Sequence, residues 1–160
     1  MSRVVLSIGS NLGDRLGHLR SAVAAFAAEL VAVSPVYETP PWGGVEQGPY
    51  LNAVLVMEGD WPPAYWLARA QEAERAADRE RSIRWGPRTL DVDIVDVAGV
   101  RSDDPDFTLP HPRAHERAFV LRPWLDVEPS AVLAGRPVVE WLARADQTGV
   151  VRRDDLVIAP

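Results

Sequence analysis

The sequence contains no cysteine, no lysine and no long apolar run. The absence of cysteine excludes disulfides, thiolate nucleophiles, iron–sulfur clusters and cysteine-ligated zinc. The 17 basic residues are all arginine, which excludes a phosphate-binding loop that ends in Gly-Lys-Ser/Thr. We therefore interpret the glycine-containing stretch 9–14 as a tight turn with a helix N-cap. The apolar runs, such as Val4–Leu6, are a few residues long and predict no transmembrane helix.

The composition is that of one folded domain. The chain has 160 residues, of which 47% are hydrophobic and 25% are charged, so it can form a core without a disulfide or a structural metal. We expect a single domain over residues 1–160. The net charge of −6 argues against broad nucleic-acid binding. Because the N-terminus shows no signal-peptide pattern, we expect a cytoplasmic protein without membrane association, and no obligate protein partner is predicted.

Proline and glycine divide the chain into short elements. The periodicity of the apolar residues predicts helices over 16–30, from 62 or 63 to 78 or 79, over 114–125 and over 138–144. Strands are expected over 3–8, 31–38, 50–58 and 89–97, with one or two more before Pro110 and a last one within 150–158. The order strand, helix, two strands, helix, strand predicts an α+β, ferredoxin-like two-layer sandwich. Its sheet is mostly antiparallel, with helices packed on it and C-terminal additions.

The strongest chemical signal is the pair Asp91 and Asp93 in the strand expected over 89–97. Because strand side chains alternate between faces, both carboxylates point away from the apolar Leu90, Val92 and Ile94. Their Cβ atoms lie roughly 6.6 Å apart, and two like charges at that range repel unless a cation lies between them. The pair therefore indicates a Mg²⁺ site with hard oxygen ligands. The pattern alone equally allows a half-buried strand whose outer face carries two aspartates.

Five arginines fall within the 14 residues that end just before this pair: Arg75, Arg79, Arg81, Arg84 and Arg88. One guanidinium group can donate two hydrogen bonds to the oxygens of one phosphate. Arginines beside metal-binding carboxylates are therefore suited to binding a polyphosphate. For Arg75 we favour an ion-paired helix surface, because acidic residues are interspersed around it. For Arg84 and Arg88 we favour phosphate binding, because they flank a Trp-Gly-Pro that cannot be helical.

Weaker candidates lie in two other stretches. Tyr50 and Asn52 share one strand face and can present an aromatic plane and an amide together. We interpret His111 and Arg117 as polar contacts to an anionic ligand, since Pro112 makes one continuous metal-binding helix improbable.

The stretch 84–94, Arg-Trp-Gly-Pro-Arg-Thr-Leu-Asp-Val-Asp-Ile, closely resembles the signature of the 6-hydroxymethyl-7,8-dihydropterin pyrophosphokinase family. The resemblance covers residues 4–125 in the family's order, and it includes the stretches 7–14, 34–41, 50–53, 110–113 and 119–121. It implies a ferredoxin-like fold and the transfer of pyrophosphate from ATP to the hydroxymethyl group of the pterin, which leaves AMP.

The resemblance also implies roles for single residues. Asp91 and Asp93 would hold two Mg²⁺ ions, while Arg88 and one or both of Arg79 and Arg81 would neutralise the phosphates. The ATP side would be lined by Gln71, Glu74, Arg81, Arg84, Trp85, Arg88, Ile94, Thr108, His111 and Arg117. The pterin would contact Thr39, Pro40, Trp42, Tyr50, Asn52, Trp85 and Phe119, with Tyr50 and Phe119 on its two ring faces. From pattern alone, Phe119 is an ordinary core residue.

Two other functions share features with this sequence. A nucleotide-sugar transferase also uses an Asp-x-Asp metal site, but such enzymes are usually larger and doubly wound. A catalytically inert ferredoxin-like module that binds a nucleotide or a partner leaves Asp91 and Asp93 beside Arg88 unexplained. No residue is an obvious general base: His111, an aspartate and a metal-acidified hydroxyl group all remain candidates.

Overall fold

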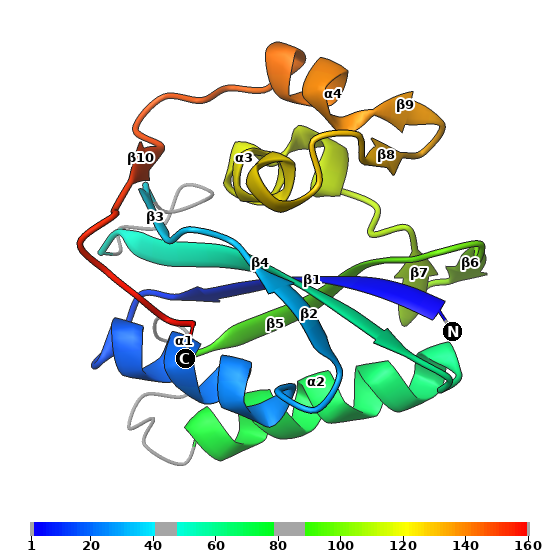
Figure 1. The fold of residues 1–160 in the computed structure, drawn as a ribbon, viewed down its shortest axis with the longest axis horizontal. Helices are drawn as coiled ribbons and strands as arrows, with labels where there is room; N and C mark the ends of the chain where they lie inside the picture. The colour runs from blue at the N-terminus through cyan, green and yellow to red at the C-terminus, as the bar shows by residue number, and fades with distance from the viewer. Residues whose placement is uncertain (1, 41–47, 79–88, 160) are drawn as a thin grey trace.

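An antiparallel sheet organises the molecule, which was obtained as a computed structural model (Figure 1). The structure describes residues 2–40, 48–78 and 89–159. The main sheet contains β1 (Ser2–Ser10), β2 (Leu30–Val33), β3 (Tyr37–Thr39), β4 (Tyr50–Gly59), β5 (Asp91–Val97) and β10 (Val151–Arg152). Its order is β10-β3-β4-β1-β5, and β2 also pairs with β4. The long strands β4 and β5 therefore flank β1, and all three can contribute side chains to one surface.

Helices cover both faces of this sheet (Figure 1). α1 (Arg15–Ala25) and α2 (Pro63–Asp78) lie on one face, and α3 (Ala118–Val127) and α4 (Val138–Arg144) lie on the other. In β1, Val4 and Leu6 belong to the core under α1 and α2, whereas Val5 belongs to the core under α3 and α4. The predicted two-layer sandwich has helices on one face of the sheet, whereas here a second helix layer covers the other face. This layer buries the second face of β1 and β4.

Several predicted elements are confirmed, with shifts that have local causes. Asp14 caps α1 by accepting the Gly17 backbone N–H at 3.0 Å, as the turn prediction required. α1 ends at Ala25, short of the predicted residue 30, because the chain turns back so that β2 can pair with β4 from Leu30. The predicted strand 31–38 divides into β2 and β3 around Pro35, which has no N–H to give to a ladder.

The C-terminal third is built from short pieces. A β6–β7 hairpin (Ser102–Asp104 and Phe107–Leu109) precedes the expected helix 114–125, which forms as a 3₁₀ turn, Ala114–Glu116, followed by α3. Arg117 separates the two because its backbone is extended, with φ −104° and ψ 100°. The hairpin β8–β9 (Val132–Leu133 and Arg136–Pro137) was not predicted, whereas α4 and β10 were. Within the described ranges no helix is long and apolar enough to cross a bilayer.

Candidate active site

A cavity of about 260 Å³ opens at the end of the sheet that faces the start of α3. It is lined by side chains from β1, β4 and β5, from the end of β3 and from the first turn around α3. The lining residues are Ser7, Gly9, Thr39, Pro40, Tyr50, Asn52, Asp91, Asp93, Arg117 and Phe119. The structure therefore brings together residues from five separate segments of the chain.

The register of the sheet places the floor of this cavity. Gly9 lies opposite both Asn52 on β4 and Asp91 on β5, and Ser7 lies opposite Asp93. These residues share the face that continues into the apolar core beneath α3 and α4, where Val5 is buried. The cavity is thus the polar end of an otherwise apolar sheet face.

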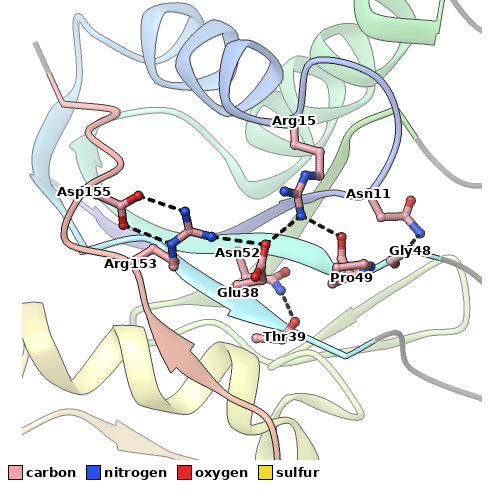
Figure 2. A network of polar contacts seen from close by, with 9 residues as sticks. All are labelled: Asn11, Arg15, Glu38, Thr39, Gly48, Pro49, Asn52, Arg153 and Asp155. Carbon is pink, nitrogen blue, oxygen red and sulfur yellow. Dashed lines mark hydrogen bonds and ion pairs between the residues drawn. The ribbon is translucent and has the colours of Figure 1, made fainter.

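Gly9 is required in the floor for steric reasons. A Cβ atom on Gly9 would lie 2.6 Å from Asn52 Oδ1, which is closer than such atoms approach each other. The Asn52 amide itself is oriented by a hydrogen bond, because its Nδ2 donates to Thr39 Oγ1 at 2.6 Å (Figure 2). With Nδ2 engaged, Oδ1 is the end of the amide that lies against Gly9 and remains an acceptor.

Asp91 and Asp93 lie side by side on the cavity face, as strand alternation predicts. Leu90, Val92 and Ile94 are buried in the opposite core, under α1 and α2. Among the described residues, no group of three or more His, Cys, Asp or Glu is placed to hold a metal ion. Two carboxylates are nevertheless a suitable donor set for Mg²⁺, which commonly takes one or two protein carboxylates and completes its coordination with substrate phosphates and water.

A second cavity, of about 250 Å³, adjoins the first at Asp93. It lies along the edge strand β5, the hairpin β6–β7 and the segment that follows it. Its lining consists of Leu67, Val92, Asp93, Ile94, Pro105, Asp106, Phe107, Thr108, His111 and Pro112. Asp93 lines both cavities, so one carboxylate lies where the two cavities meet.

His111 makes one hydrogen bond through its backbone and another through its ring. Its backbone N–H donates to the Val95 carbonyl at 2.8 Å, and its ring Nδ1 accepts the Arg113 backbone N–H at 3.1 Å. The neutral ring therefore carries its proton on Nε2 and acts there as a donor. Burial lowers the pKa of His111; Asp93 opposes this, while Arg117 and Arg113 lower the pKa further. With Nδ1 accepting a backbone N–H, the neutral ring presents a donor to the cavity.

Arg117 and Phe119 lie where the chain passes from the 3₁₀ turn into α3. The Arg117 guanidinium lies 5.5 Å from the centroid of the Phe119 ring. Burial lowers the pKa of Arg117, and Asp93 partly offsets this effect. Arginine remains charged despite such a shift, so Arg117 is a half-buried cation beside the carboxylate pair.

The residues predicted for the two substrates fall into these two cavities in large part. Thr39, Pro40, Tyr50, Asn52 and Phe119 line the first cavity with Arg117, and Ile94, Thr108 and His111 line the second. Neither lining includes Gln71, which is exposed on α2, or Glu74, whose Oε2 accepts the Val92 N–H at 2.9 Å. The predictions for Trp42, Arg79, Arg81, Arg84, Trp85 and Arg88 lie outside the described residues.

Two lining residues, Ser7 and Gly9, were not predicted as site residues. Neither carries an ionisable group, so a search for chemistry passes over them. Their signal is the alternation of β1, in which Val4, Leu6 and Ile8 are apolar while the small Ser7 and Gly9 occupy the other face.

Residues 5–129 match the family model described as 7,8-dihydro-6-hydroxymethylpterin-pyrophosphokinase. The 2-amino-4-hydroxy-6-hydroxymethyldihydropteridine pyrophosphokinase of Mycobacterium tuberculosis is 52% identical over 160 residues, which cover 91% of this chain and 85% of that protein. The protein of the same name from Methylorubrum extorquens is 39% identical over 156 residues, with 95% and 99% covered.

A solved structure shares the fold. The crystal structure of Plasmodium falciparum HPPK-DHPS wild type with SDX-DHP superposes with a TM-score of 0.67 at 11% identity over 89% of this chain. This chain spans 44% of that longer chain, so the likeness concerns one part of it and the fold alone. The family model and the curated relatives cover most of the chain and include the cavity residues. The chain therefore belongs to the 7,8-dihydro-6-hydroxymethylpterin-pyrophosphokinase family, and its function is the pyrophosphoryl transfer of folate biosynthesis.

Proposed function

We propose that this chain transfers pyrophosphate from ATP to the hydroxymethyl group of 6-hydroxymethyl-7,8-dihydropterin, with Mg²⁺ bound at Asp91 and Asp93, and releases AMP and the pterin diphosphate. The observation that carries the proposal is the position of Asp93, which lines both cavities. A Mg²⁺-dependent transfer of pyrophosphate needs carboxylate ligands for the metal at the point where the phosphates meet the attacking hydroxyl group. The first cavity takes the pterin, and the second takes part of ATP.

The first cavity suits a flat heterocycle with polar edges. Tyr50 and Phe119 supply aromatic surface, and the fixed Asn52 Oδ1 supplies an acceptor for an N–H on the edge of the ring. Thr39 and Pro40 close one side. Aromatic surface with one oriented polar group is typical of small-molecule sites.

The second cavity suits the nucleotide. The neutral His111 ring offers its Nε2–H to an anionic oxygen. The Thr108 hydroxyl donates to the Asp104 carbonyl at 2.9 Å, so it presents an acceptor to the ligand. Arg117 lies at the first cavity beside both carboxylates, where a cation counters phosphate charge.

The two Mg²⁺ ions implied by the family would be held by Asp91 and Asp93, and when bound they supply neutralisation of the phosphate charge and acidify the attacking hydroxyl group. The chain's own residues bind and orient the reactants. Arg117 balances the carboxylates, and Asn52 with Tyr50 and Phe119 fixes the ring. His111, with Nδ1 already accepting a backbone N–H, serves as a donor.

The remaining roles rest on the family resemblance. They comprise phosphate or ATP contacts by Gln71, Glu74, Arg79, Arg81, Arg84, Trp85 and Arg88, and pterin contacts by Trp42 and Trp85. The strand order and antiparallel pairing support a ferredoxin-like core from β1 to β5, to which the C-terminal elements add the second helix layer. Cytoplasmic localisation and the absence of an obligate protein partner also remain part of the proposal.

Product identification tests the reaction directly. Purified protein is incubated with ATP and the hydroxymethyl pterin, with Mg²⁺ or with EDTA, and the products are resolved by mass. We expect AMP and a pterin that gains two phosphates, both dependent on Mg²⁺ and on the pterin. ADP with a pterin monophosphate, or a sugar nucleotide as the required donor, would contradict the proposal. No turnover with intact binding would favour the inert module.

A further inference from the structure

The last part of the chain lies across the edge of the sheet, beyond the region that matches the family model. We call residues 149–158 the C-terminal strap. Its strand β10 pairs with β3, so that Val151 lies opposite Glu38, and the Arg153 N–H donates to the Val36 carbonyl at 2.8 Å. Its end is anchored because Ile158 is buried in the core under α1 and α2.

The strap also touches the wall of the first cavity. Gly149 adopts a φ of +77°, and a Cβ atom there would lie 3.1 Å from both Cδ and Cγ of Pro40. Pro40 lines the cavity. The strap thus packs directly behind a residue that we assign to the pterin.

An ion-pair network joins the strap to α1, to β3 and to the residue that precedes β4 (Figure 2). Glu38 Oε2 accepts from Arg15 Nη1 at 3.0 Å and lies 3.4 Å from Arg153 Nη1. The same Arg15 Nη1 donates to the Pro49 carbonyl at 3.0 Å. Arg153 in turn makes two bonds to Asp155, of 2.9 and 2.8 Å.

This network fixes backbone rather than ligand. Glu38 lies between Tyr37 and Thr39, so its side chain leaves β3 on the face opposite the Thr39 side chain. Thr39 and Tyr50 are opposite each other in the β3–β4 ladder, and Pro49 immediately precedes Tyr50. Holding Glu38 and the Pro49 carbonyl through one guanidinium therefore holds two lining residues, Thr39 and Tyr50, at a fixed separation.

We propose that Glu38 is a positioning residue for the pterin cavity, and that the C-terminal strap supports Glu38 in this role through Arg153. The proposal rests on the assignment of the first cavity to the pterin. About 30% of each of the Arg15, Glu38 and Arg153 side chains is exposed, so the ion pairs are partly shielded from water. Ion pairs of this kind are stronger than fully exposed ones, although the stabilisation from each pair is modest.

The test is pterin and nucleotide affinity in charge-removing variants of the full chain. In Glu38→Gln the pterin Kd should rise about three- to tenfold, because a charged hydrogen bond is lost but the side-chain shape is kept. The Kd for a non-hydrolysable ATP analogue should stay within about twofold, because the second cavity contains none of the network residues. Arg153→Gln should give a smaller rise in the pterin Kd, and Arg153→Lys should recover part of it.

Arg152→Gln is the matched control. Arg152 lies on the same strap, but it pairs with the exposed Asp154 and not with Glu38. It should leave the Kd for both ligands unchanged. If Glu38→Gln does not fold, Arg153→Gln carries the same test.

Two results would overturn the inference. One is a folded Glu38→Gln or Arg153→Gln variant with the wild-type pterin Kd. The other is an equal loss of affinity for both ligands together with a lower Tm, which indicates a merely structural contact. A wild-type protein that binds no pterin would instead contradict the proposed function.

Discussion

Asn52 donates its side-chain N–H to Thr39 Oγ1 across 2.6 Å, and this contact decides which end of the Asn52 amide faces Gly9. Both side chains are buried, at 4% and 2% exposed, so the contact is largely shielded from bulk water. A buried amide with one end fixed offers a ligand a single hydrogen-bonding pattern. The preference that we propose for this cavity, a donor on the pterin edge, therefore depends on Thr39, a residue of another strand.

Thr39→Val should weaken both stability and pterin binding. The variant keeps the side-chain shape but leaves the Asn52 N–H unsatisfied, which costs about 1–3 kcal/mol of unfolding free energy. We also expect about a tenfold higher pterin Kd, because the amide is free to rotate. Urea unfolding and ligand titration measure the two effects. Thr39→Ser keeps the oxygen and is the control; a Val variant with wild-type pterin affinity would show that the contact does not orient Asn52.

Asp91→Asn and Asp93→Asn should each reduce turnover by at least about 100-fold, as expected for loss of metal binding. The Tm should stay the same or rise, because each change relieves repulsion between two carboxylates on one strand face. Activity measured over a range of Mg²⁺ concentrations, together with thermal unfolding, tests this. Asp93→Asn should also weaken binding of Mg²⁺–ATP more than Asp91→Asn does, since only Asp93 lines the second cavity. Near-normal activity in either variant would rule out the metal assignment.

Gly9→Ala should reduce pterin affinity far more than ATP affinity. The added methyl group would lie 2.6 Å from Asn52 Oδ1, so Asn52 must move, and overpacking of this kind costs about 1–3 kcal/mol of stability. Gly48→Ala is a suitable control, because the nearest atom to its Cβ is Asn11 O at 3.9 Å. Calorimetric titration with each ligand separates the two affinities. Equal affinities in Gly9→Ala and wild type would mean that the floor at Gly9 is not in contact with the pterin.

Asp96→Asn should stabilise the protein at neutral pH. Burial raises the pKa of Asp96 above 3.8, and the charge of Glu128 raises it further, whereas the Val97 N–H acts in the opposite direction. The folded state therefore binds this proton more tightly than the unfolded state, and the free energy of unfolding falls as pH rises through that pKa. We expect a gain on the order of 0.5 kcal/mol at pH 7.

The pH dependence of that gain provides the check. The difference between variant and wild type should shrink as the pH falls toward 3.8, where Asp96 becomes protonated in both states. Urea unfolding at several pH values measures it. An Asn variant that is less stable at pH 7, or a gain that does not change with pH, would contradict the predicted cause.

The features that were predictable from sequence are those that depend on local alternation. Asp91 and Asp93 share a face because neighbouring strand residues point to opposite sides, and the same rule pairs Tyr50 with Asn52. The sequence pattern alone predicted Phe119 as a core residue, and only the family resemblance predicted that it contacts the ligand in the cavity. Its position depends on the extended backbone at Arg117, which interrupts the helix predicted there.

Features that depend on contacts formed only in the folded chain were not predictable. The donor character of His111 depends on a backbone N–H two residues along the chain, and that contact requires the folded turn. The second helix layer follows from burial of both faces of β1, which a short apolar run does not distinguish from burial of one. The pairing of β10 with β3 joins segments more than 100 residues apart, and the pattern that predicts a strand within 150–158 does not indicate its partner.

The irregularity in β5 has a consequence for the length of the chain. β1 pairs with Asp96 at Val5 and with Ile94 at Leu6, so Val95 is one residue in excess, and its carbonyl accepts the His111 N–H. Deleting Val95 would leave the alternation of Asp91 and Asp93 intact while removing the acceptor that holds His111. The extra residue thus acts as a spacer, because it leaves the alternation of the carboxylates unchanged and supplies the carbonyl that holds the histidine backbone.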